Sequence, residues 1–600
     1  MNLLRTGSVS LHPRRLFVAL LNLALVSVAV MVFATAANAQ QTGEIVGTVT
    51  DADGAPVVGV LVEARGDVLP QARTVRTVSN GNYRFGLLPP GNYTVKFTFS
   101  DGSTQTCATP VQLEQVSEVS AVFGAEAIEE IIAVGTSMVV EAGQGALNNS
   151  INSQTIDSRP VGQEYRDLMK LIPGVQYTET DRLGPSAGAS ASDNVMQFDG
   201  VDVSLPLFGN LATEPSTHDI AQVSIVRGGA KAIGFNRAGG FSMNTISKSG
   251  TNEFHGEVSY QVETKDMRAD LDTGDNPEEF DEDRSWLIAS LGGPIIRDRL
   301  FFYTSYYGPR TERSNASNAY GDVPKFEVIR DEYFAKLTFS ATENILLEGS
   351  YRTSEKETLN DGVDAFTQPS AADIGVSNQD IITLEGSWIL TDESSLSFRY
   401  NDWENETGGE PTQILDLTTT LGDSINVNSL DQMGAFRVPT LIADPATPEE
   451  VAFNEFAQPL IDQYGYLENG VPTGGGLVGT GGLIASQDFF RESWEIAYDH
   501  LFYAGDWTHD IHIGYQYMEA SELLLRVSNG WGTISAPGGL ELAEDGVTPV
   551  YYRAAVRQQG LLTPGEAAVS PPIESLTKMR SFEINDTIQK GDWTFNVGFL

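Results

Sequence analysis

From about residue 251 onward, apolar and polar residues alternate along the chain in segments of roughly ten residues, the length of a membrane-spanning strand. The clearest segments cover 333–340, 511–518 and 593–599, where alternate positions are apolar or aromatic and the others are mostly polar or small. Because successive side chains of a strand point to opposite faces, each segment predicts a β-strand with one apolar face. The pattern favours a large antiparallel transmembrane β-barrel, with lipid outside and water or a plug inside.

A two-sheet sandwich also contains alternating strands, so the connections between segments are needed to separate the two folds. Short turns are predicted at 341–344 and 391–394, and they alternate with connections at 354–380 and 404–488 that are far longer than those of soluble domains. Transmembrane barrels have short periplasmic turns and longer extracellular loops. We therefore predict a barrel whose long loops face outward.

The segment 42–123 is a series of short strands separated by turn residues. The pairs Asp53-Gly54 and Asn80-Gly81 tolerate positive φ, and Pro-Pro-Gly at 89–91 forces a stiff bend. We expect a separate β-sandwich of about seven strands in this segment.

Residues 137–250 show a mixed pattern. A short helix is predicted over Gln163–Leu171, where a following proline stops it, and a strand and turn over 195–202. A run of β-branched residues ending at Arg227 predicts a strand, and we expect a tight turn and a second strand over 241–246 to follow. These elements predict a mixed α/β domain.

The charge balance excludes one class of partner. The formal net charge is −43, with 37 Lys and Arg against 80 Asp and Glu, and such a field repels a phosphate backbone, so we predict no nucleic-acid binding. With one Cys and six His, the chain can form neither a disulfide framework nor a multi-thiolate metal site. We interpret Cys107 as a small buried hydrophobic residue.

The first 39 residues have the features of an export signal. Arg5, Arg14 and Arg15 precede an apolar run over 16–34, and Ala-Asn-Ala at 37–39 is a small-x-small cleavage pattern. We predict a signal peptide over 1–39; a membrane anchor is the alternative, because the apolar run is long.

Several motifs resemble catalytic or ligand signatures but lack the required context. G-x-S-x-G at 184–188 and G-x-G-x-x-G at 474–479 lie in loops without the strand and helix that those motifs need. The acidic stretch 270–283 lacks EF-hand spacing and is interpreted as a solvated loop. His509 and His512 face opposite sides of one strand. We predict no catalytic residue, metal site or cofactor, and a protein that is not an enzyme.

The stretch 219–256, DIAQVSIVRGGAKAIGFNRAGGFSMNTISKSGTNEFHG, resembles the end of the plug domain of TonB-dependent outer-membrane receptors, in particular their Oar-like branch. The segment 195–202, VMQFDGVD, resembles the same domain, with Phe198 in place of isoleucine, and Phe235 stands where that family usually has tyrosine. Residues 292–302 resemble an Oar-like barrel segment. The resemblance implies a plug signature that comprises Asp199, Gly200, Arg227, Gly228, Gly229, Gly239 and Gly240.

Two further resemblances lie nearer the N-terminus. Residues 47–62 and 81–93 resemble the carboxypeptidase regulatory-like domain, whose name records homology to a non-catalytic domain. The segment 127–136, AIEEIIAVGT, resembles the TonB box, with Ala133-Val134 in place of the usual valine and threonine. An extended β-branched segment can add as a strand to a partner's sheet edge, although a plain linker strand is the alternative. The implied box residues are Glu129, Glu130, Ile131, Ile132, Ala133, Val134 and Gly135.

These observations predict a mostly β chain with a small periplasmic β-sandwich, a mixed α/β plug domain and the N-terminal part of a large antiparallel transmembrane β-barrel. The expected divisions are a signal peptide at 1–39, the regulatory-like sandwich at 42–124, the TonB box at 127–136, the plug at 137–250 and a partial barrel at 251–600. We expect the chain to be incomplete at its C-terminus, because its strands after Thr251 make about half of the family barrel and an open sheet edge leaves backbone groups unpaired in lipid.

The resemblance implies a receptor of the Gram-negative outer membrane that takes up a ligand with energy from the inner-membrane proton gradient. Its partners would be TonB with the ExbB/ExbD motor, outer-membrane lipid and an extracellular ligand that the sequence does not identify. The alternative is a protein that does not transport: an adhesin, or a receptor that only signals or assembles surface structures.

Overall fold

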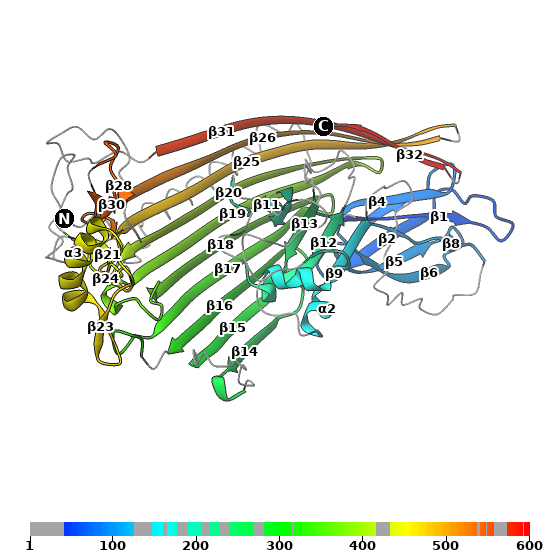
Figure 1. The fold of residues 1–600 in the computed structure, drawn as a ribbon. Coiled ribbons are helices and arrows are strands. Elements are labelled where there is room, and N and C mark those ends of the chain that lie inside the picture. Colours follow the sequence, from blue (N-terminus) through cyan, green and yellow to red (C-terminus); the bar gives the residue numbers. More distant parts are fainter. Residues whose placement is uncertain are drawn as a thin grey trace.

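The computed structural model describes residues 41–600 apart from residues 114, 125–146, 160–164, 177–189, 191–192, 207–210, 212–214, 228–239, 268–280, 315–316, 416–432, 506, 537–540, 548, 557–572 and 592. The predicted signal peptide and the predicted TonB box lie outside these described residues. The described residues form a small sandwich, a five-stranded plug sheet, one large sheet and an outer subdomain (Figure 1). The fold is mostly β, which confirms the predicted fold class.

The sandwich consists of two sheets that enclose a core of their own. One sheet has the order β4-β1-β7, with β8 also paired to β1, and the other has the order β3-β2-β5-β6. Every second residue of β1 is buried, as expected of a strand with one face on a core. The strands are β1 (Gly43–Thr50), β2 (Leu61–Gly66), β3 (Arg73–Arg76), β4 (Asn82–Leu88), β5 (Gly91–Thr98), β6 (Thr104–Val111), β7 (Val116–Glu118) and β8 (Ala121–Val122).

A buried arginine ties two strands of the sandwich together. The Arg73 guanidinium donates to the carbonyl oxygens of Gly86 and Leu87, each at 2.9 Å. Burial lowers the pKa of Arg73 to about 10, so the side chain stays charged at neutral pH. Because the charge is met by backbone carbonyls of β4, it fixes the end of β3 against that strand.

The sandwich core draws only on residues of the sandwich itself, among them the fully buried Val62 and Phe97. We therefore expect an excised fragment of residues 42–124 to fold alone. It should give a β-type circular dichroism spectrum and a single cooperative melting transition. A matched Val62→Asp fragment should be unfolded, because it buries an unpaired carboxylate. A parent fragment without a transition would contradict the predicted domain boundary.

The plug sheet has the strand order β11-β10-β13-β12-β9. Only β10 and β13 pair in parallel; the other neighbours are antiparallel. Its strands and helices are β9 (Leu147–Asn152), α2 (Ser153–Asp157), the 3-10 helices η1 (Tyr165–Leu171) and η3 (Thr217–Asp219), β10 (Val195–Phe198), β11 (Val201–Asp202), β12 (Ile220–Arg227) and β13 (Phe241–Ser247).

One detail of the plug differs from the sequence prediction: the predicted helix over 163–171 is a 3-10 helix in its described part, η1. The strands β12 and β13 pair from Arg227 with Phe241, and the tight turn predicted between them falls on residues outside the described part of the chain. The strand and turn predicted over 195–202 are both present.

The large sheet has eleven strands, each antiparallel to the next in sequence order. On β17 the outward residues Tyr333 and Leu337 are 55% and 49% exposed, whereas their neighbours Phe334 and Thr338 are buried on the inner face. This confirms the alternation predicted for a barrel wall. The strands are β14 (His255–Glu263), β15 (Asp281–Ile296), β16 (Leu300–Ser314), β17 (Phe326–Thr342), β18 (Ile345–Asp361), β19 (Asp373–Thr391), β20 (Ser394–Pro411), β25 (Leu483–Ala504), β26 (Trp507–Ser528), β31 (Ile573–Lys590) and β32 (Trp593–Phe599).

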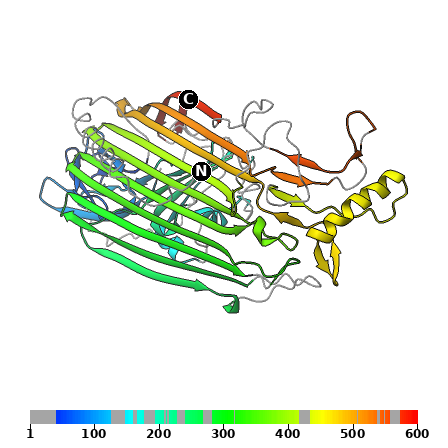
Figure 2. The ribbon, with the colours of Figure 1, turned by 90° about the vertical axis from the view of Figure 1, so that its left-hand side faces the viewer.

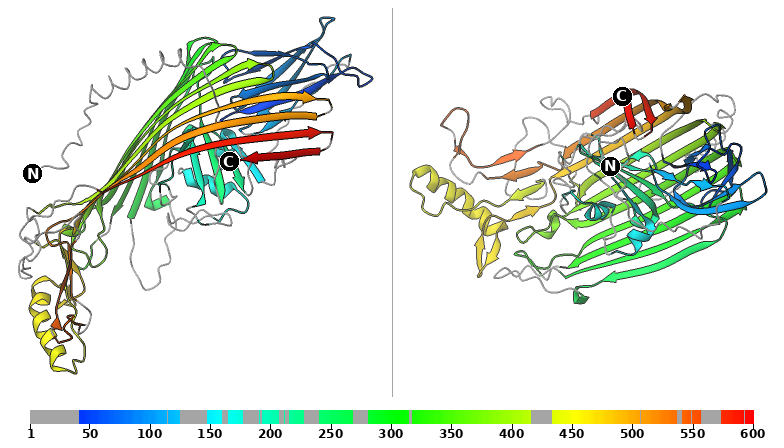
Figure 3. Two further views of the ribbon diagram at one scale, coloured as in Figure 1. Left: turned by 90° about the horizontal axis from the view of Figure 1, so that it is seen from above. Right: turned by 90° about the vertical axis from the view of Figure 1, so that its right-hand side faces the viewer.

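The two ends of the large sheet are different. At one end short turns join the strands, at 297–299, 343–344 and 392–393, and the predicted short turns lie there. The sandwich lies at this end, and the outer subdomain with its helix lies at the other (Figures 2 and 3). Short turns are typical of the periplasmic end of an outer-membrane barrel, so the sandwich lies at the end of the sheet that is expected to be periplasmic.

The predicted extracellular loops are wrong in extent. Most of 354–380 is strand, because the pairing of β18 with β19 continues beyond Glu355 and Asn378 as far as Asp361 and Asp373. Only residues 362–372 connect the two strands. The hydrogen-bonded ladder continues where both faces of the strands are polar, so the hydrophobic alternation fades before the strand ends. The 3-10 helix η5 (Pro369–Ala371) lies in the connection, and η4 (Lys265–Met267) follows β14.

The predicted loop 404–488 is partly barrel strand, since β20 extends to Pro411 and β25 begins at Leu483. The described residues of 412–482 and 531–555 form an outer subdomain whose sheet has the order β24-β21-β27-β30 and whose core includes Phe436, Phe453 and Ile534. Thr447 and Glu450 form a capping box at the start of its helix. The elements are β21 (Ala435–Arg437), α3 (Pro448–Tyr464), β22 (Tyr466–Glu468), β23 (Val471–Thr473), β24 (Leu477–Gly479), β27 (Thr533–Ser535), β28 (Glu541–Leu542), β29 (Pro549–Val550) and β30 (Arg553–Ala555). Among the described residues, no helix combines the length and apolar character needed to cross a membrane.

Candidate functional site

The plug sheet packs against the inner face of the large sheet. One hydrophobic cluster contains plug residues such as Phe198 and Ile225 together with Ile381, Trp403 and Phe489 of the barrel strands β19, β20 and β25. All of these side chains are buried. The two sheets therefore share a core, and the polar contacts described next surround it.

The turn between β10 and β11 is the first polar contact. Asp199 and Gly200 have φ of 47° and 75°, as in the two-residue turns that connect tight hairpins. The Asp199 carboxylate accepts hydrogen bonds from the backbone N–H of Ser247 at 2.8 Å and from its hydroxyl at 3.0 Å. Asn401 of β20 donates to the Gly200 carbonyl at 3.2 Å. These predicted signature residues therefore join two plug strands and touch the barrel.

Gly200 also lies against a barrel arginine. A Cβ atom at this position would stand 2.3 Å from the Cζ atom of Arg399, whose guanidinium is held by Glu385 at 2.9 Å and Glu495 at 3.2 Å. Because those carboxylates fix the guanidinium, the backbone of the turn has to come close to it. Only glycine combines that approach with positive φ at low cost.

We expect Gly200→Ala to destabilise the seated plug by about 2 kcal/mol or more, from left-handed strain and from displacement of Arg399. Gly54→Ala is the matched control, because Gly54 has φ of 83° with open space around it. The effect is measured as the rate of amide hydrogen exchange in β10 peptides at increasing urea concentration. Equal exchange in the parent and Gly200→Ala proteins would contradict the close contact.

The second contact surrounds Asp219, at the end of η3. Arg352 of β18 donates to Asp219 Oδ2 at 3.1 Å, and Tyr303 of β16 donates to Oδ1 at 3.2 Å. Arg352 also forms an ion pair with Glu332 of β17, and its Cζ lies 4.4 Å from the ring centroid of Phe198. Arg352 and Asp219 are 1–2% exposed at their side chains, so this plug carboxylate is neutralised by the barrel wall and not by water.

The third contact fixes the chain after β11. Arg491 of β25 donates to the carbonyl of Asp202 and, at 3.1 Å, to the carbonyl of Ser204. Its guanidinium also lies 3.5 Å from the Asp202 carboxylate. The three arginines Arg352, Arg399 and Arg491, which we call the arginine clamp, thus contact the plug from three barrel strands.

Sequence reasoning missed the arginine clamp, although a signal was present. Each member follows an aromatic residue in mid-strand, in the pairs Tyr351-Arg352, Phe398-Arg399 and Phe490-Arg491. The alternation of a strand then places the aromatic residue outward and the arginine inward. In a chain with 37 basic residues against 80 acidic ones, inward cations in mid-strand indicate acidic or carbonyl partners inside.

The other predicted site residues have different positions. Arg227 remains within the plug, where it donates to Asn149 Oδ1 at 2.7 Å and to the carbonyl of Pro173. The backbone N–H of Gly240 donates to the Asp193 carbonyl at 3.2 Å. Outside the described residues lie Gly228, Gly229, Gly239 and the box residues 129–135. The assignment of all these residues to a site stays a prediction.

His218 precedes Asp219 in η3 and lies beside the clamp. Its Nε2 atom and Ser290 Oγ hydrogen-bond at 3.2 Å. Burial lowers the pKa of His218, and the charge of Lys248 lowers it further. The imidazole is therefore neutral near pH 7 and adds no positive charge to the clamp.

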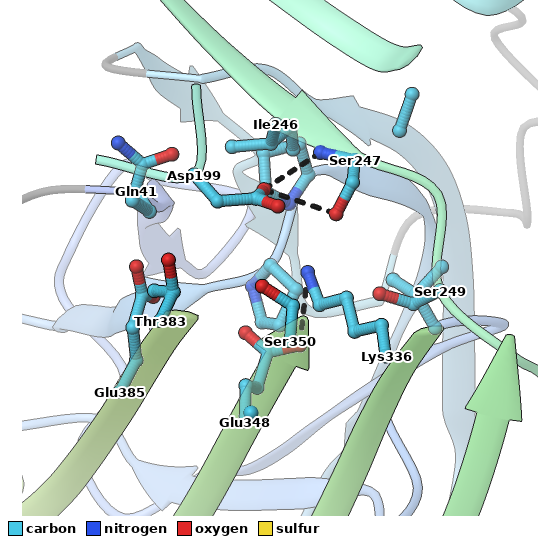
Figure 4. Close-up of a pocket in the computed structure, with 15 residues that line it drawn as sticks. Gln41, Asp199, Ile246, Ser247, Ser249, Lys336, Glu348, Ser350, Thr383 and Glu385 are labelled. Atoms are coloured by element: carbon cyan, nitrogen blue, oxygen red, sulfur yellow. Dashed lines mark hydrogen bonds and ion pairs between the residues drawn. The ribbon is translucent and has the colours of Figure 1, made fainter. Parts of the chain in front are cut away.

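A small cavity of about 40 Å³ lies where plug, barrel and sandwich meet (Figure 4). Barrel residues Lys336 and Glu385 and plug residue Asp199 line it, together with Pro89 and Pro90 of the sandwich. Asp199 Oδ2 is buried there without a protein hydrogen-bond partner. A polar cavity of this size accommodates a few water molecules, which would satisfy that oxygen.

Within the described ranges, no group of three or more His, Cys, Asp and Glu side chains is arranged to hold a metal ion. The polar groups at the site instead pair with each other across the boundary between plug and barrel. Chemically, the arrangement can hold the plug in one position.

Two domain families match the sequence. The carboxypeptidase regulatory-like domain matches residues 44–123, and the outer membrane beta barrel domain matches residues 246–429. The first match covers the sandwich, and the second begins at the end of β13 and runs into the barrel wall. Over residues 246–429 the chain is therefore similar to outer-membrane β-barrel domains.

A curated relative gives the same result. The chain is 30% identical over 326 residues to the TonB-dependent transporter Oar of Myxococcus xanthus, an alignment that covers 50% of this chain and 30% of that transporter. The chain therefore spans less than a third of the length of this relative.

Solved structures share the fold. The outer membrane transporter YddB of Escherichia coli aligns with a TM-score of 0.50 at 11% identity, over 75% of this chain and 55% of that chain. The ferric citrate transporter FecA in its unliganded form aligns with a TM-score of 0.45 at 15% identity, over 76% of this chain and 55% of that chain. The chain spans about half the length of these structures.

Proposed function

We propose that this chain, a homologue of the TonB-dependent transporters of the outer membrane, takes up an extracellular ligand with energy from the inner-membrane proton gradient. TonB, driven by ExbB and ExbD, would supply the force. The protein would act without covalent catalysis, as a transporter and not an enzyme. Its ligand class is left to experiment.

The arginine clamp is the observation that carries this proposal. Buried ion pairs add little net stability, because the desolvation of both charges offsets their attraction. They nevertheless specify one position, since an unpaired buried charge is strongly unfavourable. A plug held in this way has a defined resting position, and water can replace its polar contacts when the plug moves. A defined resting position and contacts that water can replace are both needed for a plug that opens and closes reversibly.

The order of elements supports the direction of force. The predicted box at 129–135 precedes β9, an edge strand of the plug sheet whose partner among the described residues is β12. Within the plug, tension on the box would reach β9 first, at Leu147, which pairs with Arg227. Arg227 also hydrogen-bonds to Asn149 of β9. We infer that Arg227 resists the first step of plug opening.

Ligand accumulation in cells that make the full-length protein tests the proposal. A deletion strain grown on defined nutrients identifies a ligand, and uptake of that ligand is then measured with and without a protonophore. Uptake that requires both the protein and the proton gradient is expected. Binding without energised uptake would overturn it and favour the non-transporting receptor or adhesin.

A further inference from the structure

The sandwich contacts both the barrel and the plug through a small set of polar groups. Arg84 on β4 contacts Asp510 on β26, although the two residues are 426 positions apart. The Arg84 guanidinium donates to Asp510 Oδ1 at 3.0 Å and to Oδ2 at 3.3 Å. Asp510 lies on the same strand face as the buried His512, so it faces the inside of the barrel. Arg84 therefore reaches into the barrel mouth.

Arg84 is held in position from within the sandwich. Its Nε donates to Glu44 Oε2 at 3.1 Å, and Nη2 contacts the other oxygen of that carboxylate. Both side chains are nearly nine-tenths buried, whereas Asp510 is 36% exposed at its side chain. One guanidinium thus bridges a carboxylate of its own domain and a carboxylate of the barrel.

Two further contacts reach the plug. Gln41 donates to Asn244 Oδ1 at 2.7 Å, and the backbone N–H of Leu113 donates to Gln222 Oε1 at 2.9 Å. Gln222 and Asn244 lie on β12 and β13 and are buried. The sandwich therefore contacts the central strands of the plug sheet, in addition to the end of barrel strand β26.

The same face of the sandwich closes the junction cavity. Pro89 and Pro90 form part of its wall, together with Asp199 and Lys336. Removal of the sandwich would expose these two charged plug and barrel side chains to the periplasm. The docked sandwich thus separates the base of the plug from periplasmic water.

We propose that the sandwich is a detachable stopper, held at the periplasmic mouth by Arg84, Gln41 and Leu113, and that it has to leave this position before ligand can pass. The second half of this statement rests on the proposed transport function. The sandwich ends at Val122 and the plug sheet begins at Leu147, so the predicted TonB box lies between two docked bodies. A pull on the box loads the sandwich contacts and the plug contacts together.

Hydrogen exchange in the full-length protein tests docking. Asp510→Lys places a cation against Arg84 and should speed exchange of peptides that contain the Leu113 amide by tenfold or more, because that amide loses its plug acceptor. Glu343→Lys is the matched control, since Glu343 is an exposed acid in a short turn at the same end of the large sheet. Unchanged Leu113 exchange in Asp510→Lys, or equal acceleration in Glu343→Lys, would overturn the docking surface.

A covalent lock tests whether the stopper must detach. Arg84→Cys with Asp510→Cys, in a Cys107→Ala background, is joined by a short bifunctional thiol reagent. Uptake should fall to background in the joined protein and should be retained when the same variant is treated with a monofunctional reagent. Full uptake by the joined protein would overturn detachment.

The exchange and cross-linking experiments also distinguish a failure of this inference from a failure of the proposed transport function. A parent protein that shows no energised uptake would refute the transport proposal and, with it, detachment during uptake. The exchange arm would still decide whether the sandwich is docked through Arg84.

Discussion

Replacement of Arg352 by methionine should lower the free energy that keeps the plug seated by about 3–5 kcal/mol, the usual effect of removing one partner of a buried ion pair. Arg352 meets two carboxylates, Asp219 of the plug and Glu332 of the barrel, in a site that water does not reach. After the replacement, Asp219 keeps Tyr303 and Glu332 keeps Arg330, but their charges are no longer balanced.

The measurement is the urea concentration at which exchange of β12 and β13 peptides accelerates in the full-length protein. Arg310→Met is the matched control: Arg310 pairs with Asp331 at 2.7 Å, but both side chains are about one-third exposed, and such pairs contribute about 0–1 kcal/mol. A double variant that adds Asp219→Asn should recover much of the loss, because Glu332 and Arg330 then balance each other. If it is as unstable as Arg352→Met, the unbalanced charges are not the cause.

A proline in the predicted TonB box should abolish energised uptake while outer-face ligand binding persists. Proline lacks the backbone N–H and cannot continue a ladder, so Ile132→Pro or Val134→Pro should break strand pairing with the partner. Alanine at either position keeps the backbone donor and should be much milder. Uptake and binding are measured in the same cells.

Normal uptake by both proline variants would mean that residues 129–136 are a linker strand. It would also remove the mechanical basis of the transport proposal, because no force could then enter ahead of the plug. Loss of binding in the proline variants would instead indicate a folding defect, which the alanine variants would reveal by contrast.

The sequence was sufficient to predict the barrel strands and the turn at Asp199-Gly200, because both depend on local patterns. Alternation over 333–340 predicts a strand with lipid on one side. An Asp-Gly pair predicts a turn, because both residue types tolerate positive φ. These signals need no knowledge of distant residues.

The clamp contacts could not be predicted, because they join residues that are far apart in sequence. Asp219 and Arg352 meet only after the plug sheet is seated and β18 has its register, and a one-residue slip of β18 would turn Arg352 toward lipid. The fold of 404–488 escaped prediction for a related reason. Its core includes Ile534 from another connection, so neither segment shows a complete hydrophobic pattern alone.

Because of that shared core, the connection between β20 and β25 and the connection between β26 and β31 have to evolve together. Residues 433–478 carry most of the apolar interior, including Phe436 and Phe453, and residues 531–554 carry most of the remainder. A recombinant that imported only the first segment from a relative would present a mismatched surface to Ile534 and Tyr551. We expect viable natural chimeras to exchange both segments together, so the receptor's outer face would diversify in whole blocks and not by isolated loop changes.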